Sequence, residues 1–368
     1  MASSSTDVFI VGAGPAGLAT AIAARKRGLK VVVADGAEPP IDKACGEGLM
    51  PDTLSALRDL GICVNPAEGF AFRGIRFLGE SAQVDASFPF AQGIGLRRPV
   101  LHQKMIAQAE QLGVTLLWKT SVTGLSPKGA IAGGKAIAAR WIVGADGIRS
   151  RVRRWCGLES PPMARPRYAF RRHYRVAPWT DCMEIYWGRN AQAYVTPVSR
   201  QDLCVVVISR NPGVRSTSIA AEFPELADRL AFAETTPESG AVTLTCRLER
   251  VYRDRVALIG DASGSVDAIT GEGLCLGFRQ ATALADALEA GDLGRYQTAH
   301  RRLARRPTLM GRLLLLLDKQ TKVRHRAMHA LAEHPDLFAR LVTVHVGATS
   351  LQHLAVTGAL LGWRFVVA

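Results

Sequence analysis

Val11-Gly12-Ala13-Gly14-Pro15-Ala16-Gly17 links two short apolar runs, Asp7–Val11 and Lys30–Ala34. The runs predict buried strands, and the segment between them predicts a helix that the glycines open. The spacing Gly12-x-Gly14-x-x-Gly17 allows a tight turn, close approach of the backbone to a pyrophosphate, and packing of the helix on the strand. Asp35 ends the second strand, where a carboxylate can bond to a ribose. The chain therefore contains a βαβ unit of the kind that binds a dinucleotide.

A second glycine-rich stretch lies far downstream, after the apolar run Val256–Ile259. Gly260-Asp261-Ala262 predicts a sharp turn that puts an aspartate at a strand end, where a ribityl or phosphate group can bind. Gly271-Glu272-Gly273 opens a predicted helix that closes at Gly291, and its bare backbone N–H groups suit the electron-rich edge of a flavin. The dinucleotide is therefore expected to be FAD.

The remaining strands predict a second domain. Trp141–Ala145 reads as another strand of the first domain and ends in Asp146-Gly147, whereas four β-rich segments follow with turn residues between them. We expect an α/β fold with a Rossmann-type FAD-binding domain, an interleaved antiparallel β-sheet substrate domain, and a helical C-terminal region. The expected boundaries are 1–73, 96–165 and 247–294 for the first domain, 74–95 and 166–246 for the second, and 295–368 for the helical region.

Composition narrows the class of protein. The seven cysteines are scattered and form no CxxC pair, which indicates neither a disulfide framework nor a zinc site, and no metal is expected. Met1–Thr6 is polar and has no room for the apolar part of a signal peptide, and Leu313–Leu317 is too short to span a membrane. A cytoplasmic location is the simplest expectation.

The net charge of +14 is concentrated in two segments. Arg149–Arg175 contains nine arginines and one acid, and Arg295–Arg326 contains ten basic residues and one acid. The two basic segments are either solvated faces of the protein or binding sites for an anionic substrate, an NADPH phosphate, an acidic partner or a membrane surface. Nucleic acid is not expected, because neither segment forms a known nucleic-acid-binding module.

Three motifs occur in order: Val11–Gly17, Gly144-Ala145-Asp146-Gly147-Ile148-Arg149-Ser150, and Gly260-Asp261-Ala262. Together they resemble the single-component FAD monooxygenases of the aromatic-hydroxylase type, and also the geranylgeranyl reductases and flavin-dependent halogenases that share that fold. The resemblance implies FAD as cofactor and NAD(P)H as a transient reductant that docks over it. The residues expected to bind the cofactor are Gly12, Gly14, Pro15, Ala16, Gly17, Asp35, Cys45, Gly46, Arg98, Val122, Asp146, Gly147, Gly260, Asp261, Gly271 and Gly273.

Lys43-Ala44-Cys45-Gly46-Glu47-Gly48-Leu49-Met50-Pro51 looks more like the geranylgeranyl reductases than like the phenol hydroxylases. That resemblance implies that Cys45 lies beside the flavin ring, while a small apolar cysteine in a turn is the plainer interpretation. Two features depart from the relatives. The proline that many of them carry before the glycine pair is absent at Ala268, and the halogenase WxWxIP pattern is missing.

The leading functional hypothesis is monooxygenation, in which a flavin C4a-hydroperoxide hydroxylates or epoxidises an aromatic, polyketide or terpenoid-like substrate of specialised metabolism. The alternative hypothesis is a flavoprotein like the geranylgeranyl reductases that reduces isoprenoid double bonds. A flavin-dependent halogenase and a non-catalytic flavoprotein are two further, less favoured hypotheses. The substrate is expected to be an apolar or anionic small molecule. A phenolic substrate would require a base, for which His173, Tyr186 and Tyr194 are candidates beside Cys45, although such residues in a sheet more often pack or bond to backbone.

Overall fold

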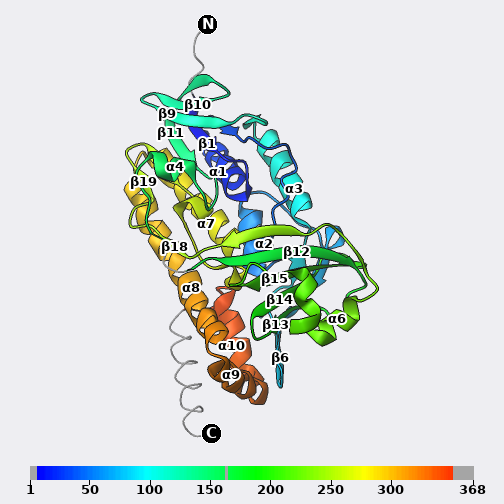
Figure 1. Ribbon diagram of the computed structural model, residues 1–368. Helices are drawn as coiled ribbons and strands as arrows, with labels where there is room; N and C mark the ends of the chain where they lie inside the picture. The colour runs from blue at the N-terminus through cyan, green and yellow to red at the C-terminus, as the bar shows by residue number, and fades with distance from the viewer. Residues whose placement is uncertain (1–5, 162–164, 351–368) are drawn as a thin grey trace.

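The computed structural model describes residues 6–161 and 165–350 of the chain (Figure 1). The predicted βαβ unit is present as β1 (Thr6–Val11), α1 (Pro15–Lys26) and β2 (Val31–Ala34). The two strands pair in parallel, as a helical crossover requires. Val8, Phe9 and Ile10 are fully buried, so the apolar run forms the centre of the first sheet.

The first sheet has eight strands, and its main path runs in the order β19-β20-β11-β1-β2-β8. The strands from β20 to β8 pair in parallel, whereas β19, β10 and β9 are joined by antiparallel pairs. Helices α3 (Arg98–Gln111) and α7 (Gly273–Ala290) pack against α1. The other strands are β8 (Thr115–Leu117), β9 (Val122–Ser126), β10 (Gly129–Ala132), β11 (Lys135–Gly144), β19 (Tyr252–Arg253) and β20 (Val256–Leu258).

The second sheet also has eight strands, and its main path runs in the order β16-β12-β15-β14-β13-β5-β6. Its β5 and β13 pair in parallel, which differs from the expected purely antiparallel sheet. The reason is that these two strands come from separate parts of the chain, with first-sheet strands between them, so no hairpin joins them. The strands are β5 (Gly74–Leu78), β6 (Gln83–Ser87), β12 (Arg167–Arg175), β13 (Cys182–Trp187), β14 (Ala191–Pro197), β15 (Asp202–Ser209), β16 (Glu234–Thr235) and β17 (Ser239–Thr243).

Both faces of the second sheet are covered. Along β15, Val206 and Ile208 pack into one hydrophobic cluster, while Val205 and Val207 pack into another on the opposite face. The second cluster includes Leu226 from the helical segment that follows β15. The short elements are β3 (Gly48–Leu49), β4 (Phe70–Phe72), β7 (Gly93–Gly95), β18 (Cys246–Arg247), β21 (Gly264–Ser265), α2 (Pro51–Asp59), α4 (Arg151–Trp155), α5 (Ile219–Glu222) and α6 (Pro224–Leu230), with 3-10 turns at Pro66–Glu68, Ser216–Ser218, Gly260–Ser263 and Ala268–Thr270.

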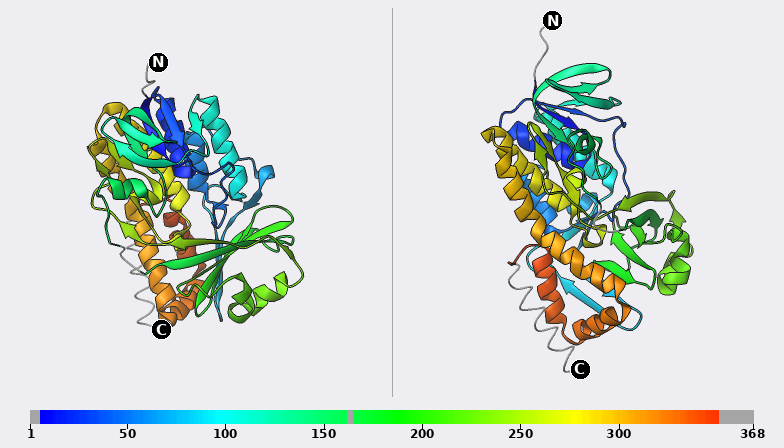
Figure 2. Two further views of the ribbon diagram at one scale, coloured as in Figure 1. Left: turned by 45° about the horizontal axis from the view of Figure 1, so that its top comes forward. Right: turned by 60° about the vertical axis from the view of Figure 1, so that its left-hand side comes forward.

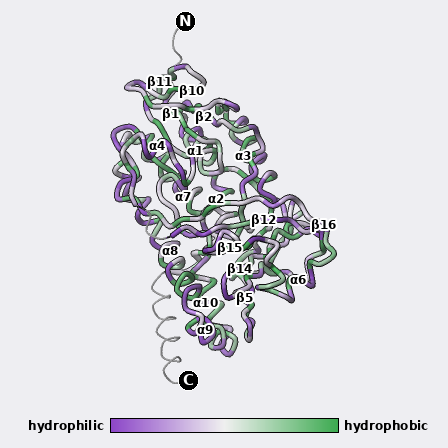
Figure 3. Tube along the Cα trace, viewed as in Figure 1, coloured by the Kyte–Doolittle hydropathy of each residue, from purple (hydrophilic) through white to green (hydrophobic). Residues whose placement is uncertain are grey.

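Three helices follow: α8 (Leu293–Lys319), α9 (Thr321–Glu333) and α10 (Pro335–His345). The long α8 runs from the first sheet to the second, and α9 and α10 cover the end of the latter (Figure 2). The Tyr296 hydroxyl donates to Leu258 O at 2.9 Å, whereas Phe338 of α10 packs against Phe77 of β5. Hydrophilic and hydrophobic stretches alternate along α8 (Figure 3).

The predicted helical tail therefore covers both domains within the described residues, and its part at 351–368 lies outside them. Among residues 6–161 and 165–350, no helix combines the length and the apolarity needed to cross a bilayer.

Candidate FAD and substrate site

A cavity of about 670 Å³ lies where the first sheet meets the second. Segments far apart in the sequence line it, including the glycine loop after β1, the loop before β3, the start of α3, and the start of α7. The residues predicted to bind the cofactor that line it are Gly12, Gly14, Pro15, Ala16, Asp35, Cys45, Gly46, Arg98, Val122, Asp146, Gly147, Gly260, Asp261, Gly271 and Gly273. The remaining one, Gly17, lies behind the loop.

The glycine loop has the shape that the fingerprint predicts. A Cβ on Gly17 would lie 1.9 Å from Gly12 O, so the helix can approach the loop only without a side chain there. A Cβ on Gly14 would meet no atom within 4 Å, so this glycine faces open cavity space. Gly17 therefore serves packing, and Gly14 leaves room for a ligand.

The three predicted aspartates are held differently from one another. Asp35 accepts backbone N–H bonds from Ala13 and Ala37, both at 2.8 Å, and so ties the glycine loop to the end of β2. Asp146 accepts from the backbone of Arg151 and Val152 and caps α4. Asp261 is part-exposed and forms only a 3.5 Å ion pair with Lys43 among the described residues. Its carboxylate is the freest of the three to bind a ligand hydroxyl.

The side chain of Arg98 indicates that the cavity fits an anionic cofactor. The residue is 8% exposed and lines the cavity, yet its Nε and Nη1 find no hydrogen-bond partner among the described residues. Buried guanidinium donors are costly to leave unpaired, and a phosphate would satisfy them. The glycine loop, Arg98 and the start of α7 therefore fit the diphosphate and the electron-rich ring of FAD, which would supply hydride and electron transfer when bound.

The second glycine pair lies at the start of α7. Gly271 has φ 66°, so the helix begins at Gly273 rather than at the predicted Gly271. Between the two glycines, the Glu272 side chain is buried and pairs with Arg306 of α8 at 3.0 Å. Burial raises the pKa of Glu272, although His345 and Arg306 oppose that rise. The start of α7 is thus held against the C-terminal helices by a buried charge cluster.

The two candidate tyrosines lie on opposite faces of the second sheet. Tyr194 lines the cavity, and its hydroxyl donates to Ile269 O at 3.0 Å. Tyr186 does not line it, in contrast to the expectation, because the residue packs against Phe223 on the other face and donates to Glu184 at 2.9 Å. Burial raises the pKa of both phenols, so they are poor bases at neutral pH.

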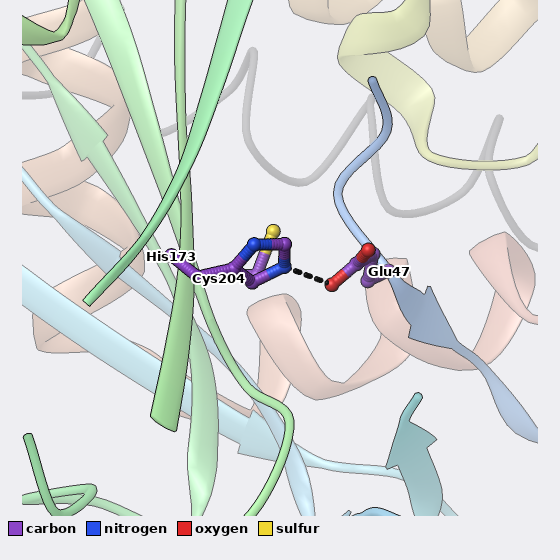
Figure 4. Close-up of side chains that lie close together, drawn as sticks. All are labelled: Glu47, His173 and Cys204. Atoms are coloured by element: carbon purple, nitrogen blue, oxygen red, sulfur yellow. Dashed lines mark hydrogen bonds and ion pairs between the residues drawn. The ribbon is translucent and has the colours of Figure 1, made fainter. Parts of the chain in front are cut away.

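His173, the third candidate base, contacts a residue to which the sequence assigned no role. Its Nε2 lies 2.7 Å from Glu47 Oε2, and Cys204 is adjacent (Figure 4). Glu47 lines the cavity beside the part-buried Cys45, whereas His173 lies behind it. Burial acts to raise the pKa of Glu47, but the bond from His173 and further donors outweigh it, so the pKa is lowered. The sequence did contain a signal for Glu47, because it is an acidic residue between Gly46 and Gly48 in the loop that was predicted to lie beside the flavin.

The arginine-rich segments are not simply solvated faces. Arg167 pairs with Asp267 at 2.8 Å, and Arg171 pairs bidentately with Asp42 at 2.7 and 2.8 Å. Arg324 is 2% exposed and lies over the Trp187 ring. Some of these arginines therefore join the second sheet to other parts of the protein: Arg167 and Arg171 join it to the loops that contain Asp267 and Asp42, and Arg324 joins it to α9.

The cavity continues along the second sheet as an apolar wall. Its residues there are Ala169, Met183, Val206, Ile208, Ala241 and Val242. This wall offers few hydrogen-bonding groups, so it suits an apolar ligand portion.

Comparisons with known proteins agree with this geometry. Residues 5–296 match the family model described as FAD binding domain. Menaquinone reductase of Mycobacterium tuberculosis H37Rv is 27% identical, covering 79% of this chain and 78% of the relative. Digeranylgeranylglycerophospholipid reductase 1 of Methanopyrus kandleri is 29% identical, covering 73% and 76%.

Solved structures share the fold at lower identity. The flavin-dependent brominase Bmp2 has a TM-score of 0.81 at 18% identity, covering 99% of this chain and 100% of that one. A geranylgeranyl bacteriochlorophyll reductase-like protein of Thermoplasma acidophilum has a TM-score of 0.74 at 20% identity, covering 96% and 95%. The predicted superfamily and fold class are thereby confirmed.

Proposed function

The chain belongs to the FAD binding domain family, and on that premise we propose that this FAD-dependent oxidoreductase reduces a carbon–carbon double bond in a long, apolar, isoprenoid-type substrate. The observation that carries the proposal is the meeting of the Cys45–Gly48 loop with the apolar wall in one cavity. An alkene chain lying along Met183 and Val206 would present a double bond beside the loop and the start of α7.

The matched curated relatives favour this reaction over the monooxygenation that led the sequence-based hypotheses. They carry the names menaquinone reductase and digeranylgeranylglycerophospholipid reductase, and both contain an isoprenoid-bearing compound in the name. The solved monooxygenase-type neighbours support the fold alone, since their identities are lower.

Saturation of an alkene adds one hydride and one proton across the double bond. The hydride would come from the reduced cofactor, and NAD(P)H is the proposed source of its electrons. The described residues contain one glycine fingerprint of the dinucleotide-binding type, at Gly12–Gly17, so NAD(P)H would dock transiently beside the FAD. The protein positions the alkene and supplies the proton.

Monooxygenation is the second candidate. The apolar wall would also exclude water, which reactive oxygen chemistry requires. Tyr194 faces the cavity and could bond to a phenolic substrate, although its raised pKa makes it a donor rather than a base.

One experiment separates the two reactions. Purified protein with bound FAD is mixed with NADH or NADPH and a polyprenyl compound, with and without oxygen, and the products are weighed by mass spectrometry. Anaerobic gain of two hydrogens supports the reductase. Gain of one oxygen atom only in air contradicts it and supports the monooxygenase, and a protein that binds no FAD contradicts both. A Cys45→Ala variant with unchanged turnover would remove Cys45 from the reaction.

We also propose that the substrate is reached from a membrane surface. Arg305, Leu309, Arg312, Leu316 and Lys319 lie three or four residues apart along α8, so they share one face of the helix, and all are exposed. Leu309 and Leu316 are 42% and 48% exposed. Alternating basic and apolar side chains suit an anionic lipid surface.

A further inference from the structure

Glu47 has an unusual backbone for its residue type. Its φ is 57°, in the left-handed region that residues with a side chain rarely adopt. The side chain is fully buried and accepts three hydrogen bonds, from His173 Nε2 at 2.7 Å, Arg98 N at 3.0 Å and Arg171 Nη1 at 3.2 Å. These three donors fix the Glu47 carboxylate in place at the cavity wall.

His173 connects this carboxylate to the edge of the second sheet. One ring nitrogen lies against Glu47, and the other, Nδ1, lies 3.5 Å from Thr236 Oγ1. The imidazole is 3% exposed, whereas Thr236 is part-exposed next to the edge strand β16. Glu47, His173 and Thr236 therefore form a row from the cavity to the solvent.

A metal ion is the competing explanation, because Glu47, His173 and Cys204 place ligand atoms within 4.8 Å of one another. Arg171 opposes it, since its guanidinium already occupies Glu47 Oε1 and is itself clamped by Asp42. Burial raises the pKa of Cys204 well above the usual value, which keeps the thiol protonated, and that thiol donates to Cys45 O. A cation would have to displace a proton and lie beside a fixed positive charge.

We propose that Glu47 and His173 form a proton relay that carries protons from solvent at Thr236 to the cavity. The proposal rests on the proposed function, because alkene saturation consumes a proton as well as a hydride. Each transfer breaks one O–H or N–H bond and forms another: water to Thr236 Oγ1, Thr236 to His173 Nδ1, His173 Nε2 to Glu47, and Glu47 to the acceptor in the cavity. One proton enters for each that leaves, and no electrons move.

The groups around the relay keep its charge balanced. Arg171 faces Glu47 from β12, Cys204 faces it from β15, and Asp42 neutralises the guanidinium. A proton on the imidazole would be balanced by the Glu47 carboxylate. Because Asp42 holds the Arg171 guanidinium, and Arg171 in turn bonds to Glu47 Oε1, the Glu47 carboxylate is fixed in position.

The test measures proton uptake rather than substrate turnover. The FAD-loaded protein is reduced anaerobically in weak buffer with reduced methyl viologen, a one-electron donor whose oxidation releases no proton, and stopped-flow absorbance follows the flavin band and a pH indicator together. In the unaltered protein, uptake should keep pace with bleaching. In His173→Gln and Thr236→Val, the same number of protons should arrive roughly ten- to hundred-fold later, and added imidazole should speed the His173→Gln reaction.

Thr235→Val is the matched control, because Thr235 is exposed on the same edge strand, one residue before Thr236, and should leave the uptake rate unchanged. Thr236 lies at the sheet edge, so its variant remains informative if His173→Gln fails to fold. Unchanged uptake rates in both variants would overturn the relay. Stoichiometric Co²⁺ binding with thiolate absorption, lost in Cys204→Ser, would identify a metal site instead. No substrate is used, so a protein that reduces no alkene would leave this result standing.

Discussion

Arg306 of α8 lies 3.0 Å from the carboxylate of Glu272, the residue between the two glycines at the start of α7. The same guanidinium lies 2.9 Å from Asp52 of α2. One part-buried cation, with its side chain 15% exposed, therefore joins the long C-terminal helix α8 to α2 and to the start of α7. It compensates two carboxylates that are each less than 10% exposed.

Arg306→Met should destabilise the protein, because the buried Glu272 and Asp52 lose the cation they share and keep only the longer contacts to His345 at 3.6 Å and Arg279 at 3.7 Å. We expect the free energy of unfolding to fall by about 3 kcal/mol, measured by urea denaturation. Arg305→Met, one residue earlier and exposed, is the control and should change it by less than about 0.5 kcal/mol. Adding Glu272→Gln to Arg306→Met should restore part of the loss. Equal stability of the two single variants would contradict the role of this cluster.

Gly14→Ala and Gly17→Ala should fail in different ways. A methyl group on Gly14 would point into open cavity space, so Gly14→Ala should have the same melting temperature as the unaltered protein when both are free of FAD. The methyl group would take up space that the cofactor needs, so FAD should bind about ten-fold more weakly or worse. The Gly17 variant would push a methyl group into Gly12 O and should lose stability before any ligand is added. Calorimetry and flavin fluorescence titration measure the two effects. Identical behaviour of the variants would refute the division of labour between these glycines.

Arg98→Gln should weaken FAD binding by about ten- to hundred-fold, because a charged donor to the cofactor phosphate is lost. The backbone N–H of residue 98 still reaches Glu47, so the local loop should be kept. Lys104→Ala on the same helix, where the lysine pairs with Glu68 at 2.7 Å, is the control. An unchanged dissociation constant in the Arg98 variant would show that the guanidinium serves another ligand.

His300 should make the stability depend on pH. Burial lowers its pKa from 6.5 to about 4, helped by Arg301. As the pH falls below about 6.5, the unfolded chain takes up the proton first, so the free energy of unfolding decreases until the pH reaches about 4. Between about pH 7 and pH 4.5, His300→Gln should lose about 2 kcal/mol less than the unaltered protein. His329→Gln, at an exposed position, is the control and should lose as much stability as the unaltered protein over this pH range. Parallel curves of unfolding free energy against pH for all three proteins would argue against a role for His300.

The exposed stripe on α8 predicts binding to anionic vesicles. Replacing Arg305 and Arg312 with glutamate should abolish co-sedimentation with phosphatidylglycerol vesicles and leave FAD absorbance intact, since both side chains point away from the protein. Replacing Arg189 and Arg200, which are exposed on loops of the second sheet, is a charge-matched control. Vesicle binding that persists in the α8 variant would place the membrane contact elsewhere.

The sequence alone determined the first domain and its cofactor. The Gly12–Gly17 fingerprint, Asp35 and Gly260–Asp261 are local patterns whose backbone requirements can be recognised without tertiary contacts. Of these residues, Gly12, Gly14, Pro15, Ala16, Asp35, Gly260 and Asp261 line one cavity. The strand residues were also readable, because burial leaves runs such as Val31–Ala34 apolar.

Only the tertiary structure decided which polar residues meet. Glu47 and His173 are far apart in the chain, and nothing local specifies that a loop and a sheet bring them to 2.7 Å. The same holds for Tyr186 and Tyr194, two similar side chains on neighbouring strands. Which of the two faces the cavity depends on strand register, because adjacent residues of a strand point to opposite sides and both faces of this sheet are buried. Local chemistry thus identified the cofactor, and the register and crossovers of the second sheet selected the residues beside it.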